Sequence, residues 1–236
     1  RSGRRSCRFD QLIFSTVGIC LWLSASSVLA QRPAAVLNHV FPAGGQIGAR
    51  FEITVAGAGL DGLTTLQCSH PAITFEQIEA NRFGVHVPEH VPPGQYDLRT
   101  VGQNGLSSAR TFSIGTYGEQ NESEPNDATQ VAQQVSLNQT INGRIDKNGD
   151  QDHFRFTAQR GQRVVIECWA ERIDSPLRAV MEVYDDQGRR LAVNRGYFGI
   201  DPLIEFVAPA DGDYVVRLFD LVYMGNESYV YRLEIG

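Results

Sequence analysis

The sequence contains little cysteine, and this limits the disulfides and metal sites that it can build. Of the four cysteines in 236 residues, Cys7 and Cys20 lie in an N-terminal segment that we expect to be removed. A disulfide between the remaining Cys68 and Cys168 would have to join two different domains, and two cysteines do not complete a zinc site. We therefore predict two buried, free thiols.

Short catalytic motifs are also missing. The sequence has no Gly-x-Ser-x-Gly stretch and no His-Glu-x-x-His stretch, which mark common serine hydrolases and zinc peptidases. Of its five histidines, His70 lies between Ser69 and Pro71, which is typical of a turn. We predict that the chain is not an enzyme. The alternative is the accessory region of a secreted serine or metallopeptidase whose catalytic domain is absent from this chain.

Long hydrophobic runs are absent as well. The apolar stretch over residues 12–23 is short for a membrane span and is interrupted by Ser15, Thr16 and Gly18. Four arginines precede it and small residues follow it, which is the pattern of a secretory signal. We expect residues 1–30 to be a cleaved signal peptide, with a retained anchor as the alternative. Cleavage would leave no membrane span and a secreted, periplasmic or cell-surface protein.

Basic side chains are outnumbered by acidic ones. Removal of residues 1–30 takes four arginines and one aspartate from 21 basic and 27 acidic side chains, which leaves 17 and 26. A nucleic-acid-binding surface needs an excess of lysine and arginine, so the balance argues against nucleic acid as a partner. It suits an exported protein, or one that binds cations.

Short alternating runs, separated by glycine and proline, make up the rest of the sequence. Hydrophobic residues form 42% of it, enough for packed cores, while 23 glycines and 10 prolines fall mainly between the runs. The run Phe51-Glu52-Ile53-Thr54-Val55 alternates as a half-buried strand does, and Asn104-Gly105 is typical of a hairpin turn. This pattern predicts an all-β fold.

Two β-sandwiches fit these runs. Residues 34–114 have the number of candidate strands of an immunoglobulin-like sandwich, and residues 136–236 have that of a jelly-roll sandwich. The intervening residues 115–135 are acidic. We predict a linker there, with one or two helical turns over residues 128–135.

Two short segments concentrate the side chains that calcium prefers. Glu122-Ser123-Glu124-Pro125-Asn126-Asp127 lies in the predicted linker, and Asp146-Lys147-Asn148-Gly149-Asp150-Gln151-Asp152 precedes a predicted strand. Calcium binds six to eight hard oxygen atoms. The second segment begins like an EF-hand loop, but it has Gln151 where that loop needs glycine and Thr157 where it needs glutamate, so we reject an EF-hand.

A composite site uses both segments. If the linker folds back onto the start of the second sandwich, the two acidic groups meet, and their mutual repulsion demands a counter-charge. The alternative is a solvated acidic linker followed by an ordinary turn of Asp, Asn and Gly. The spacing of the residues leaves both interpretations open.

Three stretches of the first unit are rich in turn residues. They are Phe41-Pro42-Ala43-Gly44-Gly45-Gln46, Gly57-Ala58-Gly59-Leu60 and Pro92-Pro93-Gly94-Gln95-Tyr96-Asp97-Leu98. Together they resemble the immunoglobulin-like TIG (IPT) fold, over the whole of the first unit.

An ordered set of motifs covers nearly all of residues 120–236. The motifs are Glu122-x-Glu124-Pro125-Asn126-Asp127, Asp150-x-Asp152-x-Phe154-x-Phe156, Gly212-x-Tyr214 and Tyr229-x-Tyr231-x-Leu233. This set resembles the bacterial pre-peptidase C-terminal domain family, whose members are similar to the collagen-binding domains of secreted bacterial collagenases. The resemblance implies a non-catalytic β-sandwich appended to an exported peptidase or another surface protein, and therefore further domains in a longer chain.

The same resemblance implies site residues. In the collagenase members the two acidic stretches hold calcium and drive a rearrangement of the linker, which here implies a calcium-stabilised joint between the domains. The candidate ligands are Glu122, Glu124, Asn126, Asp127, Asp150 and Asp152.

Late-strand aromatic residues are the candidates for contact with a partner. Collagenase relatives bind their fibrous ligand through exposed tyrosines on late strands, so the resemblance makes Tyr223 and Tyr229 candidate ligand-binding residues. Tyr231 shares a strand face with Leu233 and Ile235, and we expect it in the core. The implied partner is an extracellular protein or polysaccharide.

Overall fold

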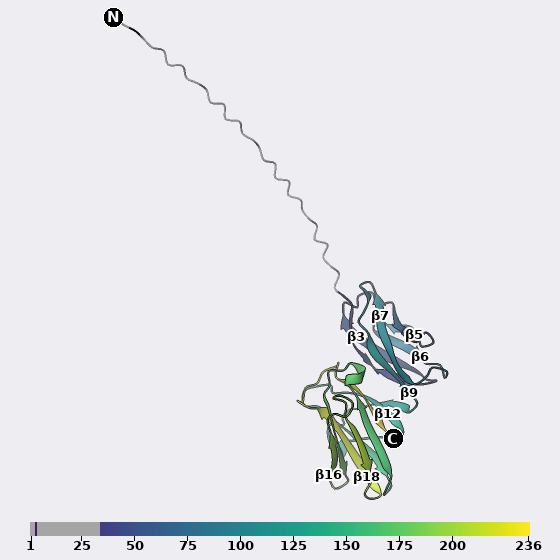
Figure 1. Ribbon diagram of the computed structural model, residues 1–236, viewed down its shortest axis with the longest axis vertical. Coiled ribbons are helices and arrows are strands. Elements are labelled where there is room, and N and C mark those ends of the chain that lie inside the picture. The colour runs from purple at the N-terminus through teal and green to yellow at the C-terminus, as the bar shows by residue number, and fades with distance from the viewer. Residues whose placement is uncertain (1–2, 4–33) are drawn as a thin grey trace. The chain divides into compact units, whose positions relative to one another are not determined.

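Residues 34–236, together with Gly3, are described by a computed structural model, and their regular structure is almost all β (Figure 1). The predicted all-β class is therefore confirmed. The predicted signal peptide over residues 1–30 lies outside the described residues, apart from Gly3. In the described part of the chain, no helix has the length and hydrophobicity required to cross a lipid bilayer.

The first sandwich consists of two sheets around one hydrophobic core. One sheet has the order β1 (Val36–Phe41), β3 (Arg50–Ala58), β6 (Arg82–His86) and β5 (Thr74–Glu79). The other has the order β2 (Gly44–Gln46), β9 (Arg110–Gly115), β7 (Gly94–Gly102) and β4 (Thr65–Cys68), with β8 (Gly105–Leu106) paired to β7.

Alternation in the sequence explains how these strands pack. Ile53 and Val55 of β3 are each 1% exposed and share a core with Phe112 of β9, while Thr54 between them points to the other face of the sheet. The hairpin predicted at Asn104-Gly105 joins β7 to β8. Gly105 has a φ of 88°, a left-handed conformation that glycine adopts without steric cost.

The second sandwich also has two sheets around one core. One sheet has the order β10 (Gly118–Asn121), β12 (Gln139–Arg144), β19 (Val230–Ile235), β14 (Arg163–Trp169) and β17 (Leu203–Val207). The other has the order β11 (Gln133–Gln134), β13 (Gln151–Ala158), β18 (Gly212–Asp220), β15 (Ala179–Asp185) and β16 (Arg190–Asn194). Two single-turn 3-10 helices accompany them, η1 (Thr129–Val131) and η2 (Glu171–Ile173).

The segment predicted as a linker, residues 115–135, is largely part of the second sandwich. β10 pairs in parallel with β12, and β11 pairs in parallel with β13. The acidic stretch therefore crosses from one sheet of the second sandwich to the other, rather than from one sandwich to the next. The helical turns predicted over residues 128–135 shrink to η1, because Gln133 and Gln134 are already paired as a strand.

Side chains of both sandwiches meet in a small third cluster. Ala43, Ile173 and Val230 are buried in it. Asp174, which follows Ile173 in the second sandwich, accepts a hydrogen bond of 2.7 Å from the backbone N–H of Thr111 in the first sandwich. Contacts of these kinds join the two sandwiches without a long connecting segment.

The cysteines of the described residues are free, as predicted. Cys168 is fully buried in the second core, and burial raises the pKa of its thiol well above the ordinary value. The predicted burial of Cys68 is only partial: this residue is half-buried, because β4 is an edge strand.

Candidate metal centre

Residues 122–127, which we call the acidic crossover, are held against the ends of two strands by backbone hydrogen bonds. The Glu122 N–H donates to the Asn142 carbonyl at 2.9 Å, and the His153 N–H donates to the Asn126 carbonyl at 3.1 Å. The Glu122 carboxylate also accepts the Arg144 N–H at 2.7 Å. These contacts fix residues 122–126 between the end of β12 and the start of β13.

Three carboxylates from the two predicted segments converge there. One ligand oxygen each of Glu124, Asp150 and Asp152 lies within 4.8 Å of the other two. Asp150 and Asp152 are 1% and 0% exposed, whereas Glu124 is exposed. The cluster is therefore buried on the side of β13 and reachable from solvent on the side of the crossover.

Several polar atoms at this cluster lack a hydrogen-bond partner within the described residues. They are Oδ1 of Asp150, Oδ1 of Asp152 and both side-chain amide atoms of Asn126, which is 0% exposed. Leaving a buried polar group unpaired costs about 1–3 kcal/mol, and more for a charged group. A bound cation or water molecule would supply the partner that these oxygens lack.

Burial and mutual repulsion disfavour the ionised carboxylates. Burial raises the pKa of Glu122 to about 8 and the pKa of Asp150 to about 6. Burial, and then the charge of Glu122, raise the pKa of Asp152 well above its ordinary value. A nearby positive charge would reverse these shifts, because it favours the ionised form.

Tyr231 connects two of the carboxylates. Its hydroxyl lies 2.6 Å from Oδ2 of Asp152 and 2.8 Å from Oε2 of Glu122. The phenol has one proton, so it can donate to only one of these oxygens at a time. Gly143 makes room for this contact, since a Cβ there would lie 2.1 Å from Cζ of Tyr231.

Lys147 supplies positive charge at the rim of the cluster. Its Nζ lies 3.8 Å from Oδ1 of Asp150 and 3.7 Å from Oδ1 of Asp127. The Lys147 side chain is 65% exposed, so it can leave the site at little cost. Its ammonium group partly offsets the repulsion among the carboxylates.

The six predicted ligands thus occupy different positions. Glu124, Asp150 and Asp152 form the cluster, and Asn126 lies beside it, with its backbone N–H donating to Oε2 of Glu124 at 2.9 Å. Glu122 stands one hydrogen bond further away, behind Tyr231, and Asp127 is exposed and faces Lys147. The site lies within the second sandwich, so the structure does not support a metal site in a joint between the two sandwiches.

Tyr231, Gly143 and Lys147 were not among the predicted site residues. Tyr231 is 1% exposed, as its strand pattern predicts. A buried tyrosine hydroxyl needs a hydrogen-bond partner. From this rule, contact between Tyr231 and one of the two acidic segments could have been predicted.

The predicted ligand-binding tyrosines differ in exposure. Tyr223 is 45% exposed, and its ring stacks on Phe219 with centroids 5.3 Å apart. Tyr229 is half-buried and packs against the core of the second sandwich. Only Tyr223 therefore presents much of its ring to solvent.

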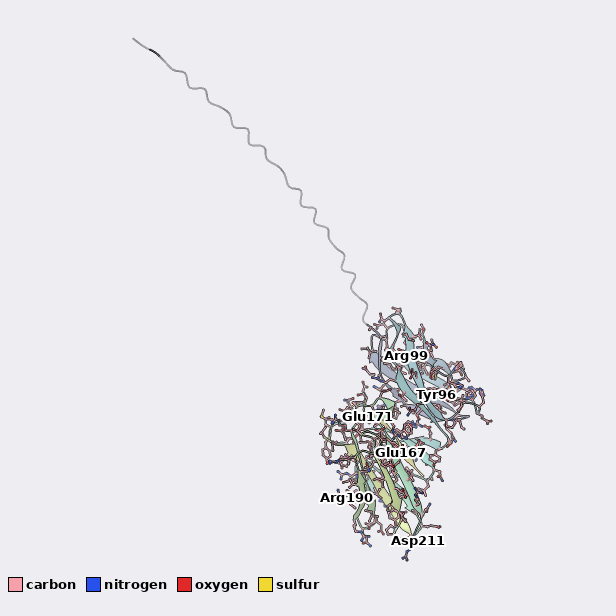
Figure 2. The ribbon with its side chains drawn as sticks, in the orientation of Figure 1. Tyr96, Arg99, Glu167, Glu171, Arg190 and Asp211 are labelled. Carbon is pink, nitrogen blue, oxygen red and sulfur yellow. The ribbon has the colours of Figure 1, made fainter. Side chains whose placement is uncertain are left out.

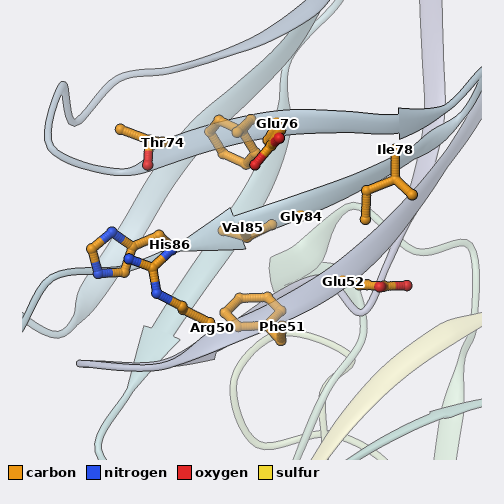
Figure 3. A pocket seen from close by; sticks show the side chains of 10 residues that line it. Arg50, Phe51, Glu52, Thr74, Glu76, Ile78, Gly84, Val85 and His86 are labelled. Atoms are coloured by element: carbon orange, nitrogen blue, oxygen red, sulfur yellow. The ribbon is translucent and has the colours of Figure 1, made fainter.

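A separate concavity lies on the outer face of the first sandwich (Figure 3). Its volume is about 570 Å³, and it runs over Gly84, which pairs with Glu52 on one side and Glu76 on the other. Arg50 and His86 lie together at one end of it in Figure 3. Charges of both signs line this trough.

Comparison with known proteins gives likenesses of architecture only. The chain matches no protein-family model and no curated protein. Among solved structures, the pre-peptidase C-terminal domain of collagenase from Bacillus anthracis is 18% identical with a TM-score of 0.38, covering 49% of this chain and 100% of that one. The periplasmic lysozyme inhibitor PliG of Aeromonas hydrophila is 17% identical with a TM-score of 0.31, covering 44% and 97%.

A third similar structure spans both sandwiches. SGBP-B from the mixed-linkage glucan utilization locus of Bacteroides ovatus is 10% identical with a TM-score of 0.29, covering 87% of this chain and 75% of that one. At these identities and TM-scores we draw no conclusion about ligand or activity. The resemblances to the pre-peptidase and TIG families stay predictions from the sequence motifs.

Proposed function

We propose that the second sandwich binds a calcium ion through Glu124, Asp150 and Asp152, with the amide oxygen of Asn126 as a further ligand. The observation that supports this proposal is the set of buried oxygens without a hydrogen bond, on side chains that converge from two segments; Oδ1 of Asp150 has only its ion pair with Lys147. A bound cation would satisfy these oxygens and offset the repulsion among the carboxylates.

The donor set favours calcium over other metals. All four side chains offer oxygen, which suits hard cations, whereas zinc prefers nitrogen and sulfur. One face of the cluster is open at Glu124, which leaves room for the waters that complete a calcium shell of six to eight oxygens.

We also propose that the protein is an exported, non-catalytic binding module whose crossover segment calcium holds in place. The ion would tie residues 124–126 to the start of β13 and thereby fix the path between the two sheets. Export rests on the signal-like sequence of residues 1–30, and the proposed partner is an extracellular protein or polysaccharide. A role beside a peptidase on a separate domain is compatible with this function.

Thermal unfolding of the full chain, with excess calcium or with EDTA, tests the metal site. A ligand at a hundredfold excess over its Kd stabilises the folded state by about 2.7 kcal/mol, so calcium should raise the midpoint clearly. Glu124→Gln keeps an oxygen for the Asn126 N–H but removes a charge, and it should abolish most of the shift.

Glu76→Gln is the matched control, because Glu76 is an exposed glutamate of the first sandwich. It should keep the full calcium shift. Identical unfolding curves in calcium and EDTA for the unchanged chain would refute the calcium site, and an equal shift with magnesium would refute the choice of metal.

A further inference from the structure

One buried carboxylate shapes an exposed loop at the end of β18. Oδ1 of Asp220 accepts the backbone N–H groups of Val222 and Met224 at 3.0 and 2.9 Å, and its Oδ2 accepts that of Arg178 at 3.1 Å. The four apolar side chains that this loop carries are all exposed: Leu221 39%, Val222 65%, Tyr223 45% and Met224 45%.

Tyr223 is held in an unfavourable backbone conformation within this loop. Its φ is 60°, in the left-handed region that bulky side chains rarely adopt. The ring lies nearly parallel to that of Phe219, at 15°. One face of the tyrosine ring is thus fixed against Phe219, while its exposure of 45% leaves the other side open to solvent.

Phe219, on which the Tyr223 ring stacks, also lines a groove on the outer face of β15, β16 and β18; Tyr223 itself does not line it. Its volume is about 570 Å³, and its apolar floor consists of Val180, Val193, Phe219 and Leu221. Arg190, which Figure 2 labels, and Arg195 line its sides. Figure 1 shows β16 and β18 in the same part of the second sandwich.

Unpaired positive charge lies in the groove at Arg195 and next to the groove residue Leu221 at Arg178. Arg178 precedes Val180 by two residues, so both side chains lie on the same face of the sheet. The Arg178 carbonyl accepts the Leu221 N–H at 2.8 Å. Across residues 34–236, no hydrogen bond or ion pair engages the guanidinium of Arg178 or Arg195. Both side chains are exposed, in a protein with a formal net charge of −6.

The carboxylate on this face is already neutralised. Glu182 accepts hydrogen bonds from Arg190 at 2.6 Å, Arg217 at 3.1 Å and the Tyr184 hydroxyl at 2.6 Å. The free guanidinium groups of Arg178 and Arg195 therefore remain available to an anionic ligand.

From this combination we infer that the groove binds an acidic polysaccharide, a chain of uronic acid units. Tyr223 and the apolar floor offer a surface for the C–H face of a sugar ring. Arg178 and Arg195 offer paired N–H donors in the geometry that a carboxylate accepts. The inference deepens the proposed binding role and does not depend on the calcium site.

An acidic peptide fits the groove less well. Extended peptides gain affinity by adding to an unpaired sheet edge, which under this groove only β16 has; the rest of the floor lies mainly on β15 and β18, which are paired on both sides. Side chains alone would have to hold a peptide there, whereas a sugar ring can use the aromatic face directly.

Calorimetric titration of the full chain tests the site, with a galacturonic acid hexamer, its methyl ester and hexaglutamate as probes. The buffer is free of calcium, because this ion itself binds galacturonate. We expect the acid hexamer to bind with 1:1 stoichiometry and about tenfold more tightly than either of the other two, because only it combines sugar rings with carboxylates. Equal binding of hexaglutamate, or no binding of the hexamer, would overturn the inference while leaving the calcium proposal intact.

Three variants locate the site. The double variant Arg178→Gln/Arg195→Gln should weaken binding of the hexamer about tenfold. Tyr223→Gly should weaken it about fivefold without lowering the unfolding midpoint, since glycine relieves the backbone strain at this position. Arg50→Gln removes an unpaired arginine from the trough of Figure 3 and should change the affinity less than about twofold. A loss with Arg50→Gln, or unchanged binding by the other two variants, would place the site elsewhere.

Discussion

The two sandwiches differ in the charged side chains that they bury. Among the described residues of the first sandwich, the buried polar side chains are His39, Thr100, Ser107 and Ser113, and none is a carboxylate. The second sandwich buries Asp150, Asp152, Glu182, Asp185, Asp201 and Asp220. A buried carboxylate is costly unless it has partners, so the second sandwich must gain something from each of them.

Most of these carboxylates stabilise the local backbone through hydrogen bonds. Asp201 accepts three backbone N–H groups and the Arg172 guanidinium, and Asp220 accepts three backbone N–H groups. Asp150 and Asp152 each keep one oxygen without a hydrogen bond, and that of Asp150 has only the ion pair with Lys147 at 3.8 Å. The difference teaches that burial of an acid does not by itself indicate a ligand; the unpaired oxygen does.

The largest effect is expected from a fully partnered carboxylate. Asp201→Asn replaces an acceptor of four N–H groups with a side chain that has one donor end. We expect it to lower the free energy of unfolding by about 3 kcal/mol, because a buried charged pair and its hydrogen bonds are lost. Urea unfolding measures this, and the loss should be the same in calcium and in EDTA. A loss that calcium repairs would erase the distinction between the two classes of carboxylate.

An unpartnered carboxylate should behave in the opposite way. Asp152→Asn replaces a carboxyl group whose ionised form burial and repulsion disfavour, so the metal-free variant should be at least as stable as the unchanged chain in urea. It should lose the stabilisation of about 2.7 kcal/mol expected at a hundredfold excess of calcium over Kd. If Asp152→Asn unfolds more easily in EDTA by as much as Asp201→Asn does, the carboxylate is structural.

A smaller effect is expected at Tyr231, which is not a proposed ligand but donates to the proposed ligand Asp152. Tyr231→Phe keeps the buried ring but removes the hydroxyl that orients Asp152. Loss of such a supporting hydrogen bond typically weakens metal binding about 10–100-fold, and we expect the lower end because Asp152 keeps its place on β13. Calorimetric titration with calcium measures the change. Tyr214→Phe is the control, because its hydroxyl contacts Ala210 rather than the cluster; an equal loss in both variants would count against the role of Tyr231.

Local patterns predicted the strands and the ingredients of the site, but not their arrangement. Alternation in β3 and the turn at Asn104-Gly105 are local signals, and both are present as predicted. Parallel pairing of β10 and β11 is not local: these strands have four and two residues, too few to carry a visible pattern. The acidic crossover therefore looked like a joint between sandwiches.

The convergence of the carboxylates was predictable only in outline. Two oxygen-rich segments flanking a strand suggested a composite site, and Glu124, Asp150 and Asp152 do meet. Which residues stay at the rim depends on the path of the crossover, and this path placed Asp127 beside Lys147 and Glu122 behind Tyr231. Unpaired atoms such as those of Asn126 are a property of the packed structure and leave no trace in a sequence.

The smallest expected effect concerns Lys147, the only lysine of the sequence. Its ammonium group stands near Asp150 and would be repelled by an incoming cation. Lys147→Gln should therefore tighten calcium binding by about two- to fivefold, the size expected of an exposed charge pair. Arg160→Gln, at an exposed turn remote in sequence from the cluster, is the control for net charge. Unchanged or weaker calcium binding in Lys147→Gln would mean that the cation does not take the place at Asp150 that the ammonium group occupies.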